Sequence, residues 1–227
     1  MQDQSYQADF IGFSGHGREA LPSGSVYERF GKRPVDISCA AFLLMLSAPL
    51  MVAITLGLML TGGTPVFAHR RVGRDGISFR CYKFRTMRKD SSRVLRFVLR
   101  TDPAAAEEWA GAQKLLDDPR VTRIGLFLRK TSLDELPQLF NVLRGDMSMV
   151  GPRPVTDREL PRYGRFLQAY LAVRPGVTGL WQVHGRGTTL FSERVEMDVA
   201  YIRKIRLFTD LKLMFQTAEV VLRRSGS

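Results

Sequence analysis

The chain has 227 residues, a formal net charge of +12 and a pI near 10.3. This length suits one globular domain with room for one membrane element. The excess of Lys and Arg indicates an anionic partner, such as a lipid surface, a nucleotide, a phosphate or nucleic acid. Cys39 and Cys81 lie in segments too different to suggest a disulfide or a metal site, which excludes a disulfide-stabilised secreted domain.

The first two dozen residues are rich in Gln, Ser, Gly and Asp, and no basic start is followed by an apolar stretch. This composition argues against a cleaved signal peptide. We expect residues 1–28 to form a disordered tail.

An uncharged apolar run follows from Ile37 to Leu60, with Pro49 at its midpoint. Proline removes a backbone donor and clashes with the preceding turn, so a helix through Pro49 must kink or break. Each half is long enough to cross one leaflet, since twelve residues of helix extend roughly 18 Å. Basic residues flank both ends of the run, which assigns both ends to the cytoplasm. We therefore predict a re-entrant membrane hairpin over residues 29–64; a kinked transmembrane helix is the alternative.

The segment Ile77–Met87 alternates as a strand does. Period-two geometry places Lys83 on the same face as Phe79 and Cys81, which is the apolar face. A lysine on that face needs a partner or a ligand, unless the strand ends there and the ammonium group reaches water.

Helices are predicted over most of the remaining chain, so the fold class is α+β and mainly helical. The segment Arg120–Lys130 interleaves apolar and basic residues, as an amphipathic helix at an anionic membrane does, although a helix packed on the core would show the same pattern. The other expected helical or amphipathic stretches are Ser92–Arg100, Pro103–Leu116, Tyr163–Val173 and Tyr201–Leu222. The basic residues of the last stretch would face acidic headgroups.

The least ordinary segment is Thr131–Pro154, which contains the adjacent carboxylates Asp134 and Glu135. Ser132-x-x-Glu135 has the form of a helix capping box, but Pro137 weakens this reading because it would lose a helical hydrogen bond. Adjacent residues at a helix start point roughly 100° apart, so the two carboxylates can have different roles. One could attack a phosphate while the other holds Mg²⁺. Basic side chains such as Lys83 and Arg129 would then reduce the repulsion between nucleophile and substrate.

Besides the proline-containing membrane segment, four blocks are distinctive: Lys83–Met87 (KFRTM), Ser132–Leu139 (SLDELPQL), Met147–Pro154 (MSMVGPRP) and Arg174–Val183 (RPGVTGLWQV), the last followed by Gly185 and Arg186. Together these blocks resemble one family, the monotopic polyprenyl-phosphate phosphoglycosyl transferases, which are bacterial sugar transferases that start polysaccharide assembly. The resemblance extends from about Lys32 to Leu222, and the chain is most similar to the branch that initiates exopolysaccharides by transferring galactose or glucose 1-phosphate.

The resemblance implies a mechanism. Asp134 would attack the β-phosphate of a UDP-sugar, expel UMP and form a phosphosugar-aspartyl intermediate, which polyprenyl (undecaprenyl) phosphate then attacks. Glu135 would lie at Mg²⁺, and Lys83 and Arg129 near the phosphates. The implied residues of the nucleotide side are Gly151, Pro152, Arg153, Pro154 and Arg186.

The resemblance also implies a location at the bacterial inner membrane, with residues 65–224 as a catalytic domain on the cytoplasmic face. The implied partners are a UDP-sugar, polyprenyl phosphate and anionic lipids, but no nucleic acid; the sequence leaves a homo-oligomer open. The family often has Ser directly before the membrane proline, whereas Ala48 separates Ser47 from Pro49 here, so the geometry of the expected break at Ser47 and Pro49 stays open. His184 stands where relatives often have Ser or Asn, and we interpret it as a tolerated variant. A basic membrane-anchored adaptor without catalysis is the alternative function.

Overall fold

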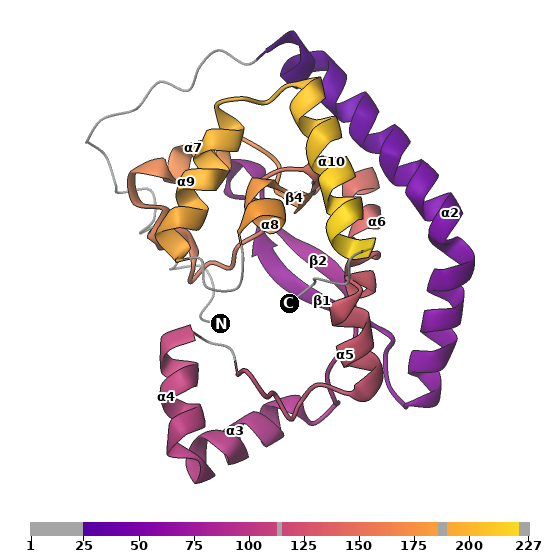
Figure 1. Cartoon of the computed structure of the whole chain (residues 1–227), viewed down its shortest axis with the longest axis vertical. Helices are drawn as coiled ribbons and strands as arrows, with labels where there is room; N and C mark the ends of the chain where they lie inside the picture. The colour runs from indigo at the N-terminus through magenta and orange to yellow at the C-terminus, as the bar shows by residue number, and fades with distance from the viewer. Residues whose placement is uncertain (1–24, 113–114, 186–189, 223–227) are drawn as a thin grey trace, which may run out of the picture.

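The computed structural model describes residues 25–112, 115–185 and 190–222. Helices dominate, and the strands form two small sheets (Figure 1). The expected α+β, mainly helical class is therefore confirmed. The helices are η2 (Tyr27–Gly31), α2 (Lys32–Leu60), η3 (Arg74–Gly76), α3 (Ser91–Thr101), α4 (Pro103–Ala112), α5 (Arg123–Lys130), η4 (Leu133–Glu135), α6 (Gln138–Arg144), η5 (Leu160–Phe166), α7 (Leu167–Leu171), α8 (Leu180–His184), α9 (Phe191–Ile202) and α10 (Leu207–Leu222).

The apolar run forms one continuous helix, α2, which passes through Pro49 without interruption. The expected separation into two half-helices is therefore wrong; Figure 1 shows α2 as a single curved helix along one side of the molecule. Together with η2 it is long and apolar enough to cross a membrane. The Ser47 hydroxyl donates to the Leu43 carbonyl at 2.6 Å, not to the Met45 carbonyl that Pro49 leaves without its helical donor.

Both ends of α2 are bound to the same globular body. At the start of the helix, the Lys32 ammonium lies 2.6 Å from Asp210 Oδ2 and 3.0 Å from the Val150 carbonyl. At its end, the Leu58 carbonyl accepts a hydrogen bond of 3.2 Å from Arg85. The two ends therefore cannot separate without breaking contacts with that body.

Residues 25–28 do not belong to a disordered tail. The Ser25 hydroxyl donates to the Ile205 carbonyl at 3.0 Å, and the Tyr27 hydroxyl donates to Asp210 at 2.8 Å. These contacts place the first described residues against α10 and the segment before it. Residues 1–24 lie outside the described residues.

The predicted strand is confirmed with shorter limits. It is β2 (Ser78–Phe84), which pairs in antiparallel fashion with β1 (Val66–Val72). Phe79 and Cys81 are buried on one face, and Lys83 shares that face, as the alternation predicted.

A second, parallel sheet of β3 (Ser148–Val150) and β4 (Gly176–Thr178) was not predicted. It forms because two glycines let the backbones cross closely. A Cβ at Gly151 would lie 2.5 Å from the Arg174 carbonyl oxygen, and one at Gly176 would lie 2.1 Å from the Gly151 nitrogen. The backbone of the motif that ends in Gly151–Pro154 therefore packs directly against the backbone of the motif around Gly176.

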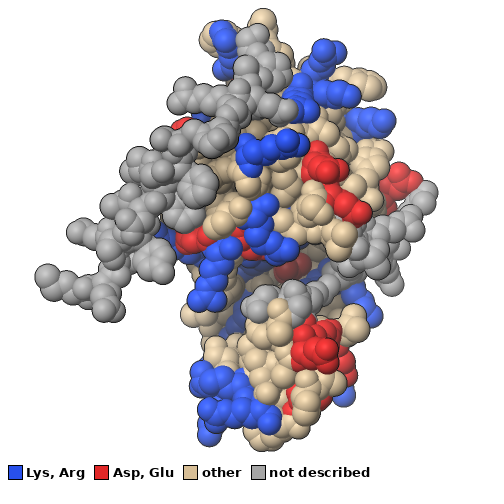
Figure 2. Space-filling model, turned by 90° about the vertical axis from the view of Figure 1, so that its left-hand side faces the viewer, with Lys and Arg blue, Asp and Glu red and all other residues tan. Residues whose placement is uncertain are grey.

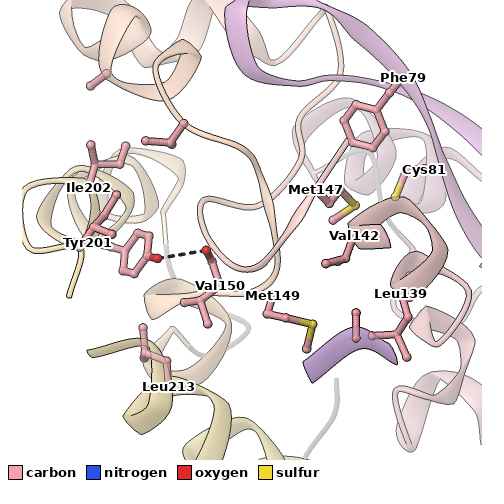
Figure 3. Packing of buried hydrophobic residues seen from close by; sticks show 14 residues of the cluster. Phe79, Cys81, Leu139, Val142, Met147, Met149, Val150, Tyr201, Ile202 and Leu213 are labelled. Carbon is pink, nitrogen blue, oxygen red and sulfur yellow. Dashed lines mark hydrogen bonds between the residues drawn. The ribbon is translucent and has the colours of Figure 1, made fainter. Parts of the chain in front are cut away.

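Figure 3 shows the main core, with residues of β3 between α6 on one side and α9 and α10 on the other. Met149 and Val150 pack with Leu139 of α6 and Leu213 of α10. The Tyr201 hydroxyl donates to the Val150 carbonyl at 3.0 Å. The burial of these apolar side chains stabilises the segment that leads into Gly151–Pro154.

Several predicted helices have different limits. The segment Arg120–Lys130 becomes helical only at Arg123, because the Thr122 side chain accepts a hydrogen bond from the Gly125 nitrogen and caps the helix. The stretch Tyr163–Val173 contains the end of η5 followed by α7, and Tyr201–Leu222 contains the end of α9, a break and then α10. Both cysteines are free, as expected.

Candidate functional site

Lys83 and Glu135 form an ion pair. The Lys83 ammonium donates to Glu135 Oε1, and both side chains are about one-third exposed. Burial acts to raise the pKa of Glu135, but the charges of Lys83 and Arg153 outweigh it, so the pKa lies below its usual range. Glu135 is therefore ionised at neutral pH, and the expected partner of Lys83 is a carboxylate.

Asp134, next in the chain, is 8% exposed and has the opposite shift. Burial raises the pKa of Asp134 to about 6; the Glu135 charge adds to the rise, while Lys83 and Arg129 oppose it. A carboxylate with this pKa is ionised at neutral pH but more basic than an exposed one. These are the properties of a nucleophile held in a half-desolvated site.

The Asp134 and Glu135 side chains project in different directions because both residues lie on the short 3₁₀ turn η4. Ser132 before it has a left-handed backbone, with φ of 54°, and its side chain caps no backbone N–H within the described chain. The capping-box reading is therefore wrong. Pro137 occupies the N-cap of α6, where its missing N–H costs nothing.

Arg129 reaches the Asp134 side of the site from the last turn of α5. Its Nε donates to the Thr86 hydroxyl at 2.9 Å. This contact needs α5 to lie against the chain that follows β2, and Gly125 permits it, since a Cβ there would lie 1.9 Å from the Thr86 carbonyl oxygen. The block Lys83–Met87 thus contributes Lys83 and the support for Arg129.

A pocket lies beside the Lys83–Glu135 pair, and its walls come from six separate stretches of the chain. The lining residues are Arg71, Cys81, Lys83, Glu135, Gln138, Arg153, Pro154, Gly176, Val177 and Gln182. Basic side chains also gather around acidic ones near the middle of the face drawn in Figure 2. Part of the excess of Lys and Arg is therefore gathered around acidic side chains on this face.

The structure brings together four of the residues expected to bind substrate or metal: Lys83, Glu135, Arg153 and Pro154. Gly151 and Pro152 contribute their backbones to the β3–β4 crossing, where the Gly176 nitrogen donates to the Pro152 carbonyl at 2.8 Å. Arg186 lies outside the described residues. His184 is exposed at the end of α8, with Nδ1 3.2 Å from the Leu180 carbonyl.

Sequence reasoning missed Arg71, Gln138 and Gln182 in the pocket wall. Arg71 lies opposite Phe79 in the β1–β2 register and pairs with Glu159 at 3.2 Å. Directly paired residues of antiparallel strands share a face, so recognising Val66–Val72 as a strand would have placed Arg71 there. Gln138 and Gln182 lie inside motifs already singled out, but their contacts arise only on folding.

An apolar cavity of about 410 Å³ lies on the opposite face of β2. Tyr82 and Phe84 alternate with Lys83 and therefore point away from the polar pocket. The residues that line the cavity are Met51, Val52, Thr55, Val66, Tyr82, Phe84, Pro137 and Phe140. One wall thus belongs to the second half of α2.

Magnesium has a limited set of donors here. Among the described residues, no group of three or more His, Cys, Asp or Glu side chains could hold a metal ion. Asp134 and Glu135 remain, and Mg²⁺ is commonly held by one or two carboxylates together with substrate phosphates. The donors therefore fit a magnesium ion shared with a phosphate substrate, and not one held by the protein alone.

The family profile described as bacterial sugar transferase matches residues 27–224. The chain belongs to the bacterial sugar transferase family. The matched range includes α2, both sheets and the polar pocket, so the family assignment applies to nearly all of the described structure.

The chain is similar to curated proteins whose names refer to sugar phosphate transfer or to exopolysaccharide production. The undecaprenyl-phosphate galactose phosphotransferase of Salmonella typhimurium is 49% identical over 88% of this chain and 42% of its own length. The exopolysaccharide production protein ExoY of Rhizobium meliloti is 46% identical, over 86% of this chain and 87% of its own. The UDP-glucose:undecaprenyl-phosphate glucose-1-phosphate transferase of Escherichia coli is 39% identical over 83% of this chain and 39% of its own length. The chain thus spans about two-fifths of the first and third relatives.

Proposed function

We propose that this protein transfers a sugar 1-phosphate from a UDP-sugar to polyprenyl phosphate, as the first membrane step of exopolysaccharide synthesis. The observation that carries the proposal is Asp134, buried and with a raised pKa, beside the Lys83–Glu135 pair and Arg129. A passive basic adaptor has no need of this arrangement. UDP-galactose is the first substrate to test, because a relative with galactose in its name is 49% identical and one with glucose in its name is 39% identical.

In the first half-reaction, an Asp134 carboxylate oxygen attacks the β-phosphorus of the UDP-sugar. The bond from that phosphorus to the bridging oxygen breaks, and UMP leaves with the bridging oxygen and its electron pair. The product on the protein is an acyl phosphate that carries the sugar. Lys83 and Arg129 offset the repulsion between the anionic nucleophile and the anionic phosphate.

In the second half-reaction, a phosphate oxygen of polyprenyl phosphate attacks the same phosphorus. The acyl oxygen–phosphorus bond breaks, which restores the Asp134 carboxylate and gives polyprenyl-diphospho-sugar. Arg153, in the pocket wall, is available to bind phosphate oxygens of the nucleotide. Mg²⁺ held by Glu135 and substrate phosphate oxygens would supply positive charge at the leaving phosphate.

The proposed location is the cytoplasmic face of a bacterial inner membrane, with α2 entering and leaving on the same side. The support is that Lys32 and Leu58, near opposite ends of α2, are both bonded to one globular body. A helix that placed its ends on opposite membrane faces would have to release one set of contacts. Exposed apolar side chains on α5, including Leu126 and Phe127, would rest on the same membrane surface as its basic residues.

The lipid substrate would approach along the second half of α2. There the apolar cavity opens beside Val52 and reaches Pro137, which is two residues from Glu135. An isoprenoid chain in this cavity would contact mostly apolar side chains. Its phosphate would then need to reach the polar side of β2.

The decisive experiment separates the half-reactions. Purified protein is mixed with UDP-galactose or UDP-glucose and Mg²⁺ without lipid acceptor, and UMP and intact protein mass are measured. We expect stoichiometric UMP and a protein heavier by one hexose phosphate, followed by loss of that mass when polyprenyl phosphate is added. Product formed on adding lipid without prior UMP or adduct would replace the covalent mechanism with direct transfer. No product from any UDP-sugar would favour the adaptor.

Membrane topology has a separate test. Single cysteines are introduced near Arg29 and near Arg74 in a background without Cys39 and Cys81, and sealed vesicles are labelled from each side with an impermeant maleimide. We expect both positions to react from the cytoplasmic side. Reaction from opposite sides would show that α2 spans the membrane.

A further inference from the structure

Arg194 of α9 is a buried charge that the proposed mechanism does not use. It is 8% exposed, and its guanidinium carbon lies 4.9 Å from the centroid of the Trp181 ring and 5.1 Å from that of Phe191. Ring faces attract a cation but do not satisfy the in-plane N–H donors. Nε and Nη2 are both buried and have no hydrogen-bond partner among the described residues.

Arg194 acts on two carboxylates, Asp198 and Glu159, and neither meets this need; Glu159 is paired with Arg71. Asp198 lies one turn further along α9, and its Oδ2 accepts a hydrogen bond of 2.7 Å from the Tyr163 hydroxyl, while its Oδ1 is buried without a hydrogen-bond partner among the described residues. No ion pair within 4.0 Å joins it to Arg194 in the part of the chain that the structure describes. Burying an arginine with two unpaired N–H donors lowers the free energy of unfolding unless another anion accepts hydrogen bonds from them.

Other cations surround the same position. Arg153 also contacts the Trp181 ring, at 5.3 Å from its centroid, and Arg153 lines the polar pocket. Arg71 is close enough that both arginines act on it: burial lowers the pKa of Arg71, and Arg153 and Arg194 lower it further against the attraction of Glu159. Arg71 and Arg153 line the pocket, and Arg194 does not line it but shares the Trp181 ring with Arg153. Such a concentration favours an anionic ligand.

The position within the site indicates which anion. Lys83 acts on both Asp134 and Glu135, and Arg129 acts on Asp134. Arg153 acts on Glu135 and on Asp198, and Arg194 acts on Asp198 but is not among the groups that act on Asp134 or Glu135. Arg194 therefore adjoins the part of the pocket that contains Arg153, because both guanidinium groups contact the Trp181 ring. The phosphate attacked by Asp134 must be near Lys83, so the neighbouring phosphate of a nucleotide diphosphate would extend toward this side.

We infer that Arg194 binds the phosphate of the departing nucleoside monophosphate through Nε and Nη2. This pair of donors is the fork with which arginine binds two oxygens of one phosphate. Trp181 holds the guanidinium plane in place. The inference rests on the proposed function for the identity of the ligand as a nucleotide, but nucleotide binding can be measured without turnover.

The test uses Trp181 as a reporter. The two tryptophans of the chain are Trp109 and Trp181, so Trp109→Phe leaves Trp181 as the single one, next to Arg194. Trp181 fluorescence is titrated with UMP and with uridine, without lipid or UDP-sugar, in this background and in Arg194→Met and Arg194→Lys. Arg162→Met is the matched control, because exposed Arg162 lies 4.0 Å from the centroid of the same Phe191 ring.

We expect Arg194→Met to weaken UMP binding by about tenfold or more, with uridine binding unchanged, since only UMP offers a phosphate. Arg194→Lys keeps the charge but loses the fork, and should weaken UMP by roughly threefold or more. Arg162→Met should change neither ligand.

Two results with Arg194→Met would overturn the inference. One is UMP binding by Arg194→Met that equals the parent. The other is an equal loss of UMP and uridine with a lower melting temperature, which would assign Arg194 to packing alone. If Arg194→Met does not fold, UMP binding by Arg194→Lys at the parent level would also refute it. Failure of sugar transfer with UMP binding intact in the parent would refute the proposed function and leave this inference standing.

Discussion

The two faces of strand β2 differ in chemistry although their residues alternate along one segment. Cys81 and Lys83 face a polar pocket with Glu135 and Arg153, whereas Tyr82 and Phe84 face the apolar cavity beside α2. A two-residue period is sufficient to separate a water-soluble anionic substrate from a lipid chain. The segment that contains Glu135 and Pro137 touches both regions, so the proposed chemistry is placed where the two faces meet.

The largest expected effect is on the polar face. Asp134→Asn removes the proposed nucleophile, so UMP release and the protein adduct should fall by roughly 10⁴-fold or more. Folding should survive, since the raised folded-state pKa means that ionised Asp134 destabilises the native state above pH 6. The variant should therefore match or exceed the wild-type melting temperature at pH 8 and lose that advantage near pH 4. Single-turnover UMP release and calorimetry measure the two effects, and near wild-type UMP release would end the covalent mechanism.

The second effect concerns the neighbouring carboxylate. Glu135→Gln removes the ion pair with Lys83 and a charged oxygen donor for Mg²⁺. We expect a rate loss of roughly 10²-fold and a higher magnesium requirement, because a neutral amide is a poorer ligand for a hard cation. The measurement is UMP release against magnesium concentration. An unchanged magnesium dependence would remove Glu135 from the metal site while leaving its pairing with Lys83.

The pH profile distinguishes the two carboxylates further. Asp134 has to be ionised to attack, so single-turnover UMP release should decline as the pH falls through about 6. Glu135 contributes to the raised pKa of Asp134, so in Glu135→Gln the decline should move to lower pH. A profile that is flat down to pH 5, or a shift in the opposite direction, would contradict this assignment.

Sequence alone predicted the polar face better than the rest of the fold. The alternation around Lys83 and the adjacent carboxylates are local patterns, and local periodicity determines which side chains share a face. The β3–β4 sheet was missed because each strand has three residues, too few for a periodic signal, and because it depends on the close approach of Gly151 and Gly176. Long-range packing of this kind leaves no local pattern.

In the membrane segment, the sequence predicted a feature that the structure does not have, whereas the β3–β4 sheet is a feature that the sequence did not predict. Pro49 predicted a kink or a break that separates two half-helices, but the helix is continuous and curved, since proline removes one hydrogen bond and a long apolar helix retains the others. Arg194 was missed for a different reason: in sequence it is one arginine among many, and only folding buries it against Trp181. The candidate site was therefore predictable where neighbours in sequence act together, and not where α9 and α8 meet.

The smallest expected effect tests the apolar face. Val52→Trp adds bulk at the wall of the cavity, and Leu56→Trp is the matched control: both residues are 58% exposed on α2, but only Val52 lines the cavity. We expect Val52→Trp to form the protein adduct at the wild-type rate and to raise KM for polyprenyl phosphate by about tenfold, close to 1.4 kcal/mol of lost binding. Leu56→Trp should leave both steps unchanged. Equal effects of the two variants would point to a general disturbance of α2 in the membrane, and a slower adduct step in Val52→Trp alone would show that the two faces of β2 are not separable. The difference between the two half-reactions, measured on the same preparations, is what assigns the cavity to the lipid substrate.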